Sequence, residues 1–534
     1  MQTMYKKFTA CLLAGTLVAA ACNKTLNTSP YVSFSESTAY STPQRVLLAL
    51  TGVYDAAQSG FYVGNVIRGY PFGAANVEQG DMRGEDMLNQ AQFYQVTYEA
   101  TYNSTTPNNG FMWQTLYALI NKANLTIEGV KGAVANNIVT AAVGTQYEAE
   151  CRFLRAMAYH ELVTHFARPY ADGSGSKLGV VYRDFGISSD ETIAKAREQK
   201  RETVAQNYDH ILADLDFAEA NLTNKALPNP VPGTADPTPV NYRATKAAAI
   251  ALKMRVKLHK RDWAGVITEG SKLVPATQPF ISPIGGWKLN ATPDAAFSNN
   301  LTDESILSIK NDANDNGGNN GALANMFGSP ALGARGLVRV SPIAYNLQTW
   351  RCDDKRRSTL LVQDGRSYYT TKYRDYTNKV DAAPQIRYAE VLLILAEAEA
   401  RSAAGVSTRA LDLLNAVRNR ALSDPITQSY TIASFATKNA LIQAILDERR
   451  IEFLGEGKRW GDIHRLALDP DFPSGGIPAK MTFANATFAS YNCATNPALT
   501  KSIVGVPYSD FKFIWPIPLE ETQQNPNIEQ NPGY

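Results

Sequence analysis

ERRIEFLGEGKRWGDIHRL, the stretch from Glu448 to Leu466, sets charged side chains of both signs around the aromatic anchors Phe453 and Trp460. On a helix, Glu448, Glu452 and Glu456 recur at every fourth position and therefore share one face. A dense run of charge interleaved with apolar residues indicates an ion-pair network that is partly buried. The alternative is a solvated helix with a few contacts, which is the default interpretation for such a stretch standing alone.

Two spacings in this stretch suggest local ion pairs. Arg449 lies three residues before Glu452, and Arg459 lies three residues before Asp462, so each pair can meet on one side of a helix. The stacked glutamates could also imitate a glycosidase, which needs carboxylates about 5–10 Å apart across a cleft. Because arginines surround them, we predict that they are neutralised and structural.

Helical periodicity recurs along the chain. The run from Val391 to Leu395 is apolar without interruption, which predicts a buried helix. Gly405 follows it and suits the turn of a helical hairpin. Few segments alternate like strands, so we predict a mainly α fold in which tetratricopeptide-like hairpins form a scaffold. The segments with helical periodicity are 147–167, 243–260, 386–402, 408–421 and 438–455.

Two long segments, 60–110 and 271–350, lack helical periodicity and hold aromatic residues among Gly, Asn and Ser. Loops of this length are usually functional or disordered. Aromatic rings stack on sugars, and Asn, Gln and Arg bind hydroxyl groups. The alternative is that these rings only anchor the loops to the body. From loop position and chemistry we predict as ligand-binding residues Tyr70, Asn76, Arg83, Tyr94, Trp287, Tyr345 and Trp350.

The N-terminus has the order of a secretory signal peptide. Lys6 and Lys7 precede an apolar stretch, Phe8–Leu17, which is too short to span a membrane. Ala19 to Ala21 then lead into Cys22, and LVAAAC is similar to a bacterial lipobox. We predict a signal peptide over residues 1–21, a lipidated Cys22 and a single body over 22–534. Plain cleavage after the three alanines is the alternative.

Composition excludes several classes of protein. Loss of Lys6 and Lys7 takes the formal charge from +2 to about zero, which disfavours nucleic acid as a partner. Beyond the signal and Cys22, the cysteines are Cys151, Cys352 and Cys493, too few for a disulfide framework. One pair can form, and the odd thiol is expected to be buried.

The C-terminal segment, FIWPIPLEETQQNPNIEQNPGY, is proline-rich and therefore cannot form a continuous helix. Trp515 and Ile517 give it apolar anchors, so we expect a tail packed against the body.

With these features in order, the chain resembles the SusD/RagB family of outer-membrane nutrient-binding lipoproteins. The resemblance covers nearly the whole chain and follows the signal cysteine. The matching segments are ESTAYSTPQRVLLALTGVY from Glu36, WQTLYALINKAN from Trp113, RFLRAMAYHELVTHFARPY from Arg152, Arg243 to Trp263, IRYAEVLLILAEAEA from Ile386, LLNAVRNRA from Leu413, the opening stretch, Pro516-Ile517-Pro518 and Gln530-Asn531-Pro532-Gly533.

The resemblance implies a largely helical body whose loops form a ligand face, with no enzymatic activity and no cofactor. It implies that the protein captures oligosaccharide at the outer membrane and passes it to a SusC-like TonB-dependent transporter, with the helical face meeting the transporter. Surface-displayed members often carry acidic residues soon after the lipidated cysteine. Here Asn23-Lys24-Thr25 follow, and the first acid is Glu36.

Two motifs imitate metal sites. His160 and His165 are five residues apart, so on a helix their side chains diverge by about 140°, whereas helical zinc ligands need a spacing of four. Asp312 opens a calcium-like loop, but its twelfth position is Leu323 instead of glutamate. We predict no metal site at either motif.

We therefore predict a non-enzymatic, lipid-anchored protein of the outer membrane that binds oligosaccharide. A second hypothesis keeps the fold and the transporter but changes the cargo to peptide or glycoprotein, since the early loop is rich in tyrosine and poor in tryptophan. A third is a helical-repeat assembly scaffold without a small ligand. A hydrolase ranks fourth.

Overall fold

The computed structural model describes residues 38–58, 69–225, 227–229, 231, 234, 236, 238–298 and 300–534. The predicted signal peptide, Cys22 and residues 59–68 of the first predicted loop lie outside this part of the chain. Within it the fold is mainly helical, with 19 α-helices and four two-stranded sheets. The predicted fold class is confirmed. None of the helices in the described residues combines the length and the apolar character that crossing a bilayer requires.

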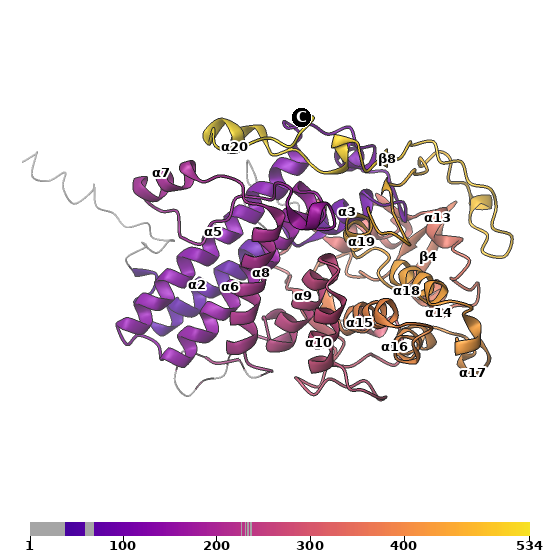
Figure 1. Ribbon diagram of the computed structural model, residues 1–534, viewed down its shortest axis with the longest axis horizontal. Helices are drawn as coiled ribbons and strands as arrows, with labels where there is room; N and C mark the ends of the chain where they lie inside the picture. Colours follow the sequence, from indigo (N-terminus) through magenta and orange to yellow (C-terminus); the bar gives the residue numbers. More distant parts are fainter. Residues whose placement is uncertain are drawn as a thin grey trace, which may run out of the picture.

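The N-terminal half is a layer of long helices (Figure 1, indigo to magenta). Helices α2 (Pro43–Gln58), α5 (Pro107–Ala135), α6 (Ala141–Phe166) and α8 (Val204–Asn221) pack side by side in sequence-neighbour order. Helices α6 and α8 begin at polar caps: Thr140 accepts a hydrogen bond from the Val143 amide, and Thr203 accepts one from the Gln206 amide.

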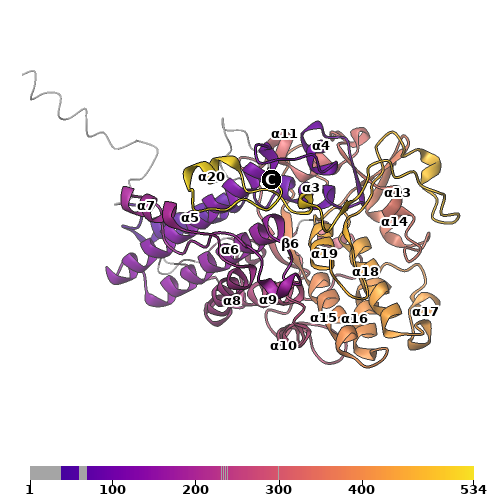
Figure 2. The same ribbon diagram turned by 45° about the horizontal axis from the view of Figure 1, so that its top comes forward.

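The second helical group consists of hairpins that continue this layer (Figure 2). Its members are α9 (Lys246–His259), α10 (Trp263–Leu273), α15 (Tyr388–Ser402), α16 (Thr408–Asn419), α18 (Lys438–Glu452) and α19 (Arg459–Arg465). The five predicted helices are confirmed as α6, α9, α15, α16 and α18, with ends within three residues of the prediction except at the start of α6, which begins six residues earlier. The run Val391–Leu395 is buried on all sides, as its uniform hydrophobicity predicts.

Short elements fold against these helices, some inside the two segments predicted to be long loops and others outside them. The short helices are α3 (Ala74–Met82), α4 (Gln95–Tyr98), α7 (Asp190–Glu198), α11 (Gly318–Gly321), α12 (Leu323–Phe327), α13 (Pro342–Tyr345), α14 (Lys355–Thr359), α17 (Pro425–Gln428) and α20 (Leu519–Gln524). The antiparallel strand pairs are β1 (Met87–Asn89) with β3 (Val338–Val340), β2 (Ser305–Ile309) with β6 (Ala383–Arg387), β4 (Leu361–Asp364) with β5 (Ser367–Thr370), and β7 (Gly476–Ile477) with β8 (Val506–Pro507).

The charged stretch forms a buried ion-pair network, as predicted. Glu452 lies at its centre and accepts Arg387 Nη1 at 3.0 Å and Arg420 Nη2 at 2.7 Å. Glu448 and Glu456 extend the network at its two sides. We call the set of Glu304, Arg356, Lys372, Arg387, Arg420, Glu448, Glu452 and Glu456 the charged hub; each of its side chains is 6 % exposed or less.

Every carboxylate of the hub has cationic partners at short range. Arg356 Nη1 lies 2.6 Å from Glu448, and Lys372 Nζ lies 2.6 Å from Glu456. Burial by itself would raise the pKa of Glu452, but its three arginines hold that pKa well below the ordinary range of a glutamate. Glu452 is therefore ionised at neutral pH, and the four carboxylates of the hub lie among four cationic side chains.

The predicted local pairs within the stretch are wrong. Arg449 pairs with Asp462 at 2.9 Å, and Arg459 pairs with Glu85 at 2.7 Å. The reason is that α18 ends at Glu452, and the positive φ angles of Gly455 (77°) and Gly457 (72°) turn the chain before α19 begins. Both members of each predicted pair still lie on one helix, but Glu452 binds Arg387 and Arg420 of the hub, and the turn brings Asp462 of α19 back to Arg449 of α18.

The C-terminal tail and the cysteines agree with the sequence. Trp515 and Ile517 are buried, and the Trp515 amide donates to the carbonyl oxygen of His165, so the predicted packed tail is confirmed. Cys352 and Cys493 form a disulfide across 141 residues, and Cys151 is a buried free thiol.

Removal of one hub carboxylate should leave buried arginines without a counter-charge. We expect Glu452→Ala to lower the free energy of unfolding by about 3–5 kcal/mol, as measured by urea denaturation. Glu198 is exposed at the end of α7, so Glu198→Ala is the control and should change stability by less than about 0.5 kcal/mol. Equal effects of the two substitutions would contradict the role of the hub.

Candidate functional site

Six of the seven predicted ligand-binding residues lie in the core and do not form a solvent-facing site. Each exposes 9 % of its surface or less: Tyr70, Arg83, Tyr94, Trp287, Tyr345 and Trp350. The aromatic rings anchor the segments to the body, because a segment with little regular structure is held by burying its largest apolar groups. We therefore assign none of the six to direct ligand contact. Asn76 is half-buried and lines a cavity.

Arg83 shows what such a buried residue does instead. Its guanidinium carbon lies 3.3 Å from the ring centre of Trp460 and 5.0 Å from that of Trp515. It also donates to the carbonyl oxygen of Phe513. Burial lowers the pKa of Arg83 to about 10, so the side chain keeps its charge at neutral pH. Arg83 thus joins α3, α19 and the tail.

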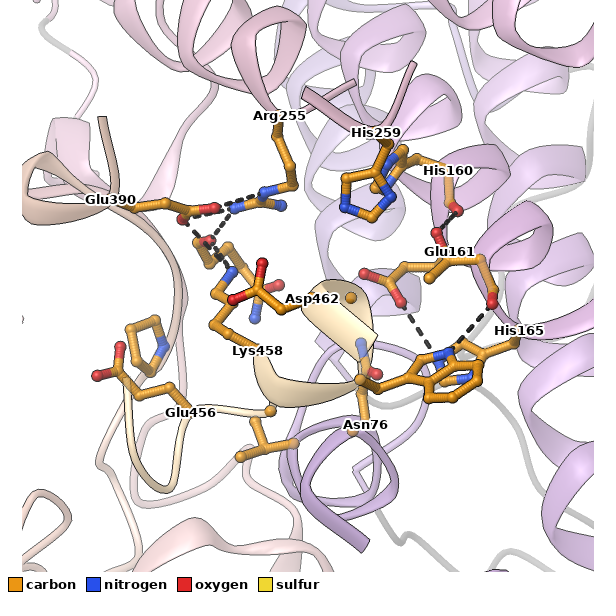
Figure 3. Close-up of a pocket in the computed structure, with 18 of the residues that line it drawn as sticks. Asn76, His160, Glu161, His165, Arg255, His259, Glu390, Glu456, Lys458 and Asp462 are labelled. Atoms are coloured by element: carbon orange, nitrogen blue, oxygen red, sulfur yellow. Dashed lines mark hydrogen bonds and ion pairs between the residues drawn. The ribbon is translucent and has the colours of Figure 1, made fainter. Parts of the chain in front are cut away.

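A polar cavity of about 60 Å³ lies where α3, α6, α9, α15 and α19 meet (Figure 3). Asn76 lies at its edge. On one side Arg255 binds Glu390 through two hydrogen bonds of 2.7 and 2.8 Å. On the other side Glu161 lies 3.4 Å from Nε2 of His165. The cavity therefore lies between the two helical groups and is lined by paired charges.

Burial and neighbouring charges shift the pKa values of several groups in this cavity. Burial opposes the charge of Glu390, but Arg255 and Lys458 outweigh it and lower its pKa to about 2. Burial lowers the pKa of His160 to about 4, so its ring is neutral at pH 7; outside the cavity, burial likewise lowers the pKa of His464 to about 3. His160 packs against His259 at 4.7 Å between ring centres.

The two histidines of the zinc-like motif diverge in the structure. His160 faces His259, whereas the ring of His165 stacks on Trp515 with 4.5 Å between centres. Within the described residues, no three His, Cys, Asp or Glu side chains are grouped to hold a metal ion. The cavity has room for a few water molecules, and ligand pockets usually measure 300–1,000 Å³. This joint cavity is too small for an oligosaccharide.

A larger cavity opens at the surface beside the C-terminal tail. Its volume is about 390 Å³, within the range of ligand pockets. We call it the tail pocket. Its polar and aromatic lining residues are Arg168, Asp172, Lys177, Tyr508, Ser509 and Asn531. The first three and Tyr508 are at least partly exposed, so a ligand in the pocket can reach an aromatic ring, a guanidinium, a carboxylate and an amine.

The end of α6 and the tail build this pocket together. Helix α6 stops at Phe166, and Pro169 prevents its continuation, so Arg168 points away from the helix toward the tail. Its guanidinium lies 4.8 Å from the ring centre of Tyr508 and donates to the Asp510 carbonyl oxygen at 3.0 Å. Phe513 packs edge-on against Tyr508 at 4.9 Å. The aromatic ring is therefore held on two sides.

Hydrogen bonds fix the polar groups of the tail pocket. The Tyr508 hydroxyl donates to Asp172 Oδ2 at 2.7 Å, and Lys177 Nζ lies 3.7 Å from the same carboxylate. Burial first, and then Asp172, raise the pKa of Tyr508 above its ordinary value, so the phenol keeps its proton. The pocket presents both donors and acceptors, which is the pattern that sugar hydroxyl groups need.

Sequence reasoning missed the tail pocket because its two sides are 340 residues apart. The ARPY segment ending at Tyr170 and the aromatic residues of the tail were both recognised, but only as parts of the scaffold. A signal was present in principle: Arg168 and Tyr508 each stand next to a proline that ends regular structure.

Comparisons with known proteins agree on one family. A family model described as the SusD family matches residues 348–534. A second model, described as starch-binding and associating with the outer membrane, matches residues 56–258. The two models thus match opposite halves of the chain.

Individual proteins agree over most of the length. SusD-like protein P38 of Formosa agariphila is 23 % identical over 570 aligned residues, which cover 96 % of each chain. SusD-like protein P2 of the same organism is 26 % identical over 79 % of this chain and 80 % of its own.

Solved structures agree in the same way. A SusD superfamily protein of Bacteroides fragilis is 26 % identical with a TM-score of 0.72, covering 92 % of this chain and 100 % of its own. Surface glycan-binding protein A of Bacteroides uniformis, 21 % identical, shares the fold with a TM-score of 0.66, over 92 % and 99 % of the two chains.

The neutral buried histidines predict acid sensitivity. The folded state does not protonate His160 until about pH 4, whereas the unfolded chain does so near pH 6.5, so stability falls as the pH drops through this window. We expect His160 to contribute roughly 1–2 kcal/mol to the loss between pH 7 and pH 5. Urea denaturation at both pH values should show a smaller loss for His160→Asn.

The control for that measurement is His210→Asn, because 40 % of the His210 side chain is exposed. If the free energy of unfolding falls equally between pH 7 and pH 5 in His160→Asn and His210→Asn, burial of His160 does not cause the acid sensitivity.

Proposed function

The chain belongs to the SusD/RagB family, and from that membership we propose that it is a lipid-anchored outer-membrane protein that binds oligosaccharide nutrients and passes them to a SusC-like TonB-dependent transporter. The observation that carries the proposal is the pair of family models, which match residues 56–258 and 348–534 and include a description of starch binding. Members of this family are binding proteins, so no catalytic role is assigned to the glutamates of the charged hub.

The tail pocket is the oligosaccharide site that we assign. Its volume of about 390 Å³ suits one or two sugar rings, and the small joint cavity does not. Tyr508 supplies an aromatic surface, and Asp172 and Lys177 supply groups that bind hydroxyls. Arg168 holds the ring of Tyr508 in place.

Membrane attachment follows from the N-terminal segment. We assign residues 1–21 to a signal peptide and Cys22 to lipidation, so that residues 22–534 form the mature protein. The family model describes association with the outer membrane. The acyl chains on Cys22 would supply that association directly, since a two-chain anchor holds a protein stably on a bilayer. Display on the outer face completes the proposal, because the transporter receives its cargo there.

Two alternatives keep the same fold. A peptide or glycoprotein cargo would use the same pocket, whose Arg168, Asp172 and Lys177 also match peptide groups. An assembly scaffold without a small ligand would leave the pocket unused. Titration with both classes of ligand separates the three functions.

We expect calorimetry of a soluble form beginning at Asn23 to detect heat with at least one oligosaccharide from a panel of oligosaccharides and peptides, without product formation. Tyr508→Ala should weaken that binding at least tenfold, or about 1.4 kcal/mol, because the stacking surface is removed. Heat with peptides alone would favour the second function, and no heat across the panel would favour the scaffold.

Phe488→Ala is the matched control for the aromatic substitution. Phe488 is 54 % exposed and does not line the tail pocket, so its loss should leave sugar binding within twofold of the parent protein. Loss of binding in Phe488→Ala with retention in Tyr508→Ala would move the site to the loop around Phe488.

The lipid anchor has a separate test. We expect Cys22→Ser to abolish acyl labelling and to move the protein from the membrane fraction to the soluble fraction of the cell envelope. The reason is that the chain loses the thiol to which the lipid is attached through a thioether bond. Ala21→Gly, next to the cysteine, is the control and should stay with the membrane. Membrane retention of Cys22→Ser would contradict the anchor.

A further inference from the structure

A third cavity lies on the helical scaffold and has a cationic character that the proposed function does not use. Its volume is about 160 Å³, and it opens between the ends of α9 and α15 and the starts of α10 and α18. These four helices are neighbours in both views (Figures 1 and 2). We call it the arginine cavity. Its lining is Arg261, Trp263, Arg401, Lys438, Ile442, Asp469, Pro470 and Asp471.

Three cations face two carboxylates in this cavity. Asp469 Oδ2 lies 3.0 Å from Arg401 Nη1 and 3.3 Å from Arg261 Nη2, so one carboxylate is shared between two guanidiniums. Asp469 cannot turn to serve either arginine better, because its Oδ1 accepts the amides of Asp471 and Phe472. Lys438 donates only to a neutral group, the Ala403 carbonyl oxygen at 3.1 Å.

Hydrogen-bond donors of the two arginines are left over. Arg401 Nη2 and Arg261 Nε are buried atoms without a hydrogen bond. The side chain of Arg401 is only 7 % exposed, and its other nitrogens are held by Glu397 at 2.9 Å and by Asp469. A buried guanidinium donor without an acceptor is destabilising. Both arginines line the open cavity, so a ligand there can reach them.

We propose that the arginine cavity binds the carboxylate group of a small acid. Arg401 Nη2 and Arg261 Nε each lack an acceptor, and the two oxygens of a carboxylate can supply acceptors to both arginines. The planar fork of a guanidinium pairs with a carboxylate through two parallel hydrogen bonds. A phosphate dianion would bring a second negative charge close to Asp469 and Asp471.

The size and walls of the cavity restrict the rest of the ligand. Trp263 and Ile442 form an apolar side, and the Arg401 guanidinium lies 4.8 Å from the Trp263 ring centre. A volume of about 160 Å³ is below that of ordinary ligand pockets, so the cavity admits a short acid or one acidic sugar ring. The shared chemistry is a carboxylate, whether free or carried on a sugar.

Saturation-transfer NMR on the soluble form beginning at Asn23 tests the proposal, because it detects millimolar binding. The probes are acetate, glucuronate, glucose and inorganic phosphate at matched ionic strength. We expect saturation of acetate or glucuronate, with glucuronate alone indicating an acidic sugar and both indicating small acids in general. Phosphate is followed by calorimetry, and binding as tight as that of the carboxylates would overturn the assignment.

Three substitutions locate the binding. Lys438→Gln removes a partly exposed cation outside the ion pairs, so it should fold normally and weaken carboxylate binding at least threefold. Arg401→Lys keeps the charge but loses the fork, and we expect at least a tenfold loss. Lys288→Gln, whose side chain is 50 % exposed at another place, is the control and should change nothing. Carboxylate binding that all three variants retain would overturn the proposal.

This inference stands apart from the proposed function. Glucuronate could also enter the tail pocket, so Tyr508→Ala is measured in parallel. Signals lost in Lys438→Gln but kept in Tyr508→Ala belong to the arginine cavity. Signals with the reverse pattern belong to the tail pocket, and they would overturn the carboxylate site while supporting the oligosaccharide site.

Discussion

The buried ion pairs around Glu452 constrain how the C-terminal half of the protein packs. Their members come from distant parts of the chain: Glu304 precedes β2, Arg387 ends β6, and Arg420 follows α16. Charges with so little exposure are stable only when every partner is in place, because a lone buried charge costs several kcal/mol. A helix that slid or rotated would separate these pairs. The hub therefore selects one arrangement among many that would bury similar apolar area.

Aromatic residues pack the C-terminal half of the protein against the N-terminal half. Arg83 lies between Trp460 of α19 and Trp515 of the tail, and His165 of α6 stacks on Trp515. Large aromatic rings from the segments predicted to be loops also point into the core, because burying them holds these segments on the body. The body is thereby filled, and room for a ligand remains at its margins, where the ends of helices meet irregular segments.

The two cavities assigned to ligands differ in chemistry and in place. The tail pocket combines an aromatic ring with neutral and charged hydrogen-bonding groups, as suits hydroxyl-rich sugars. The arginine cavity lies among the hairpins of the scaffold and is lined by two arginines, each with a hydrogen-bond donor left over. In our two proposals, the protein recognises a glycan at the first site and a carboxylate at the second.

The sequence by itself determined the helices, the mainly α class and the burial of the charged stretch, because periodicity, caps and local charge density act over a few residues. The bounds of α6, α9, α15, α16 and α18 follow from such local terms. Only the tertiary structure decided which charged and aromatic side chains contact one another. Arg449 pairs with Asp462 instead of Glu452 because two glycines turn the chain, and Tyr508 meets Arg168 from 340 residues away. Whether an aromatic residue in a loop faces solvent or core depends on what packs above it, and no local pattern contains that information.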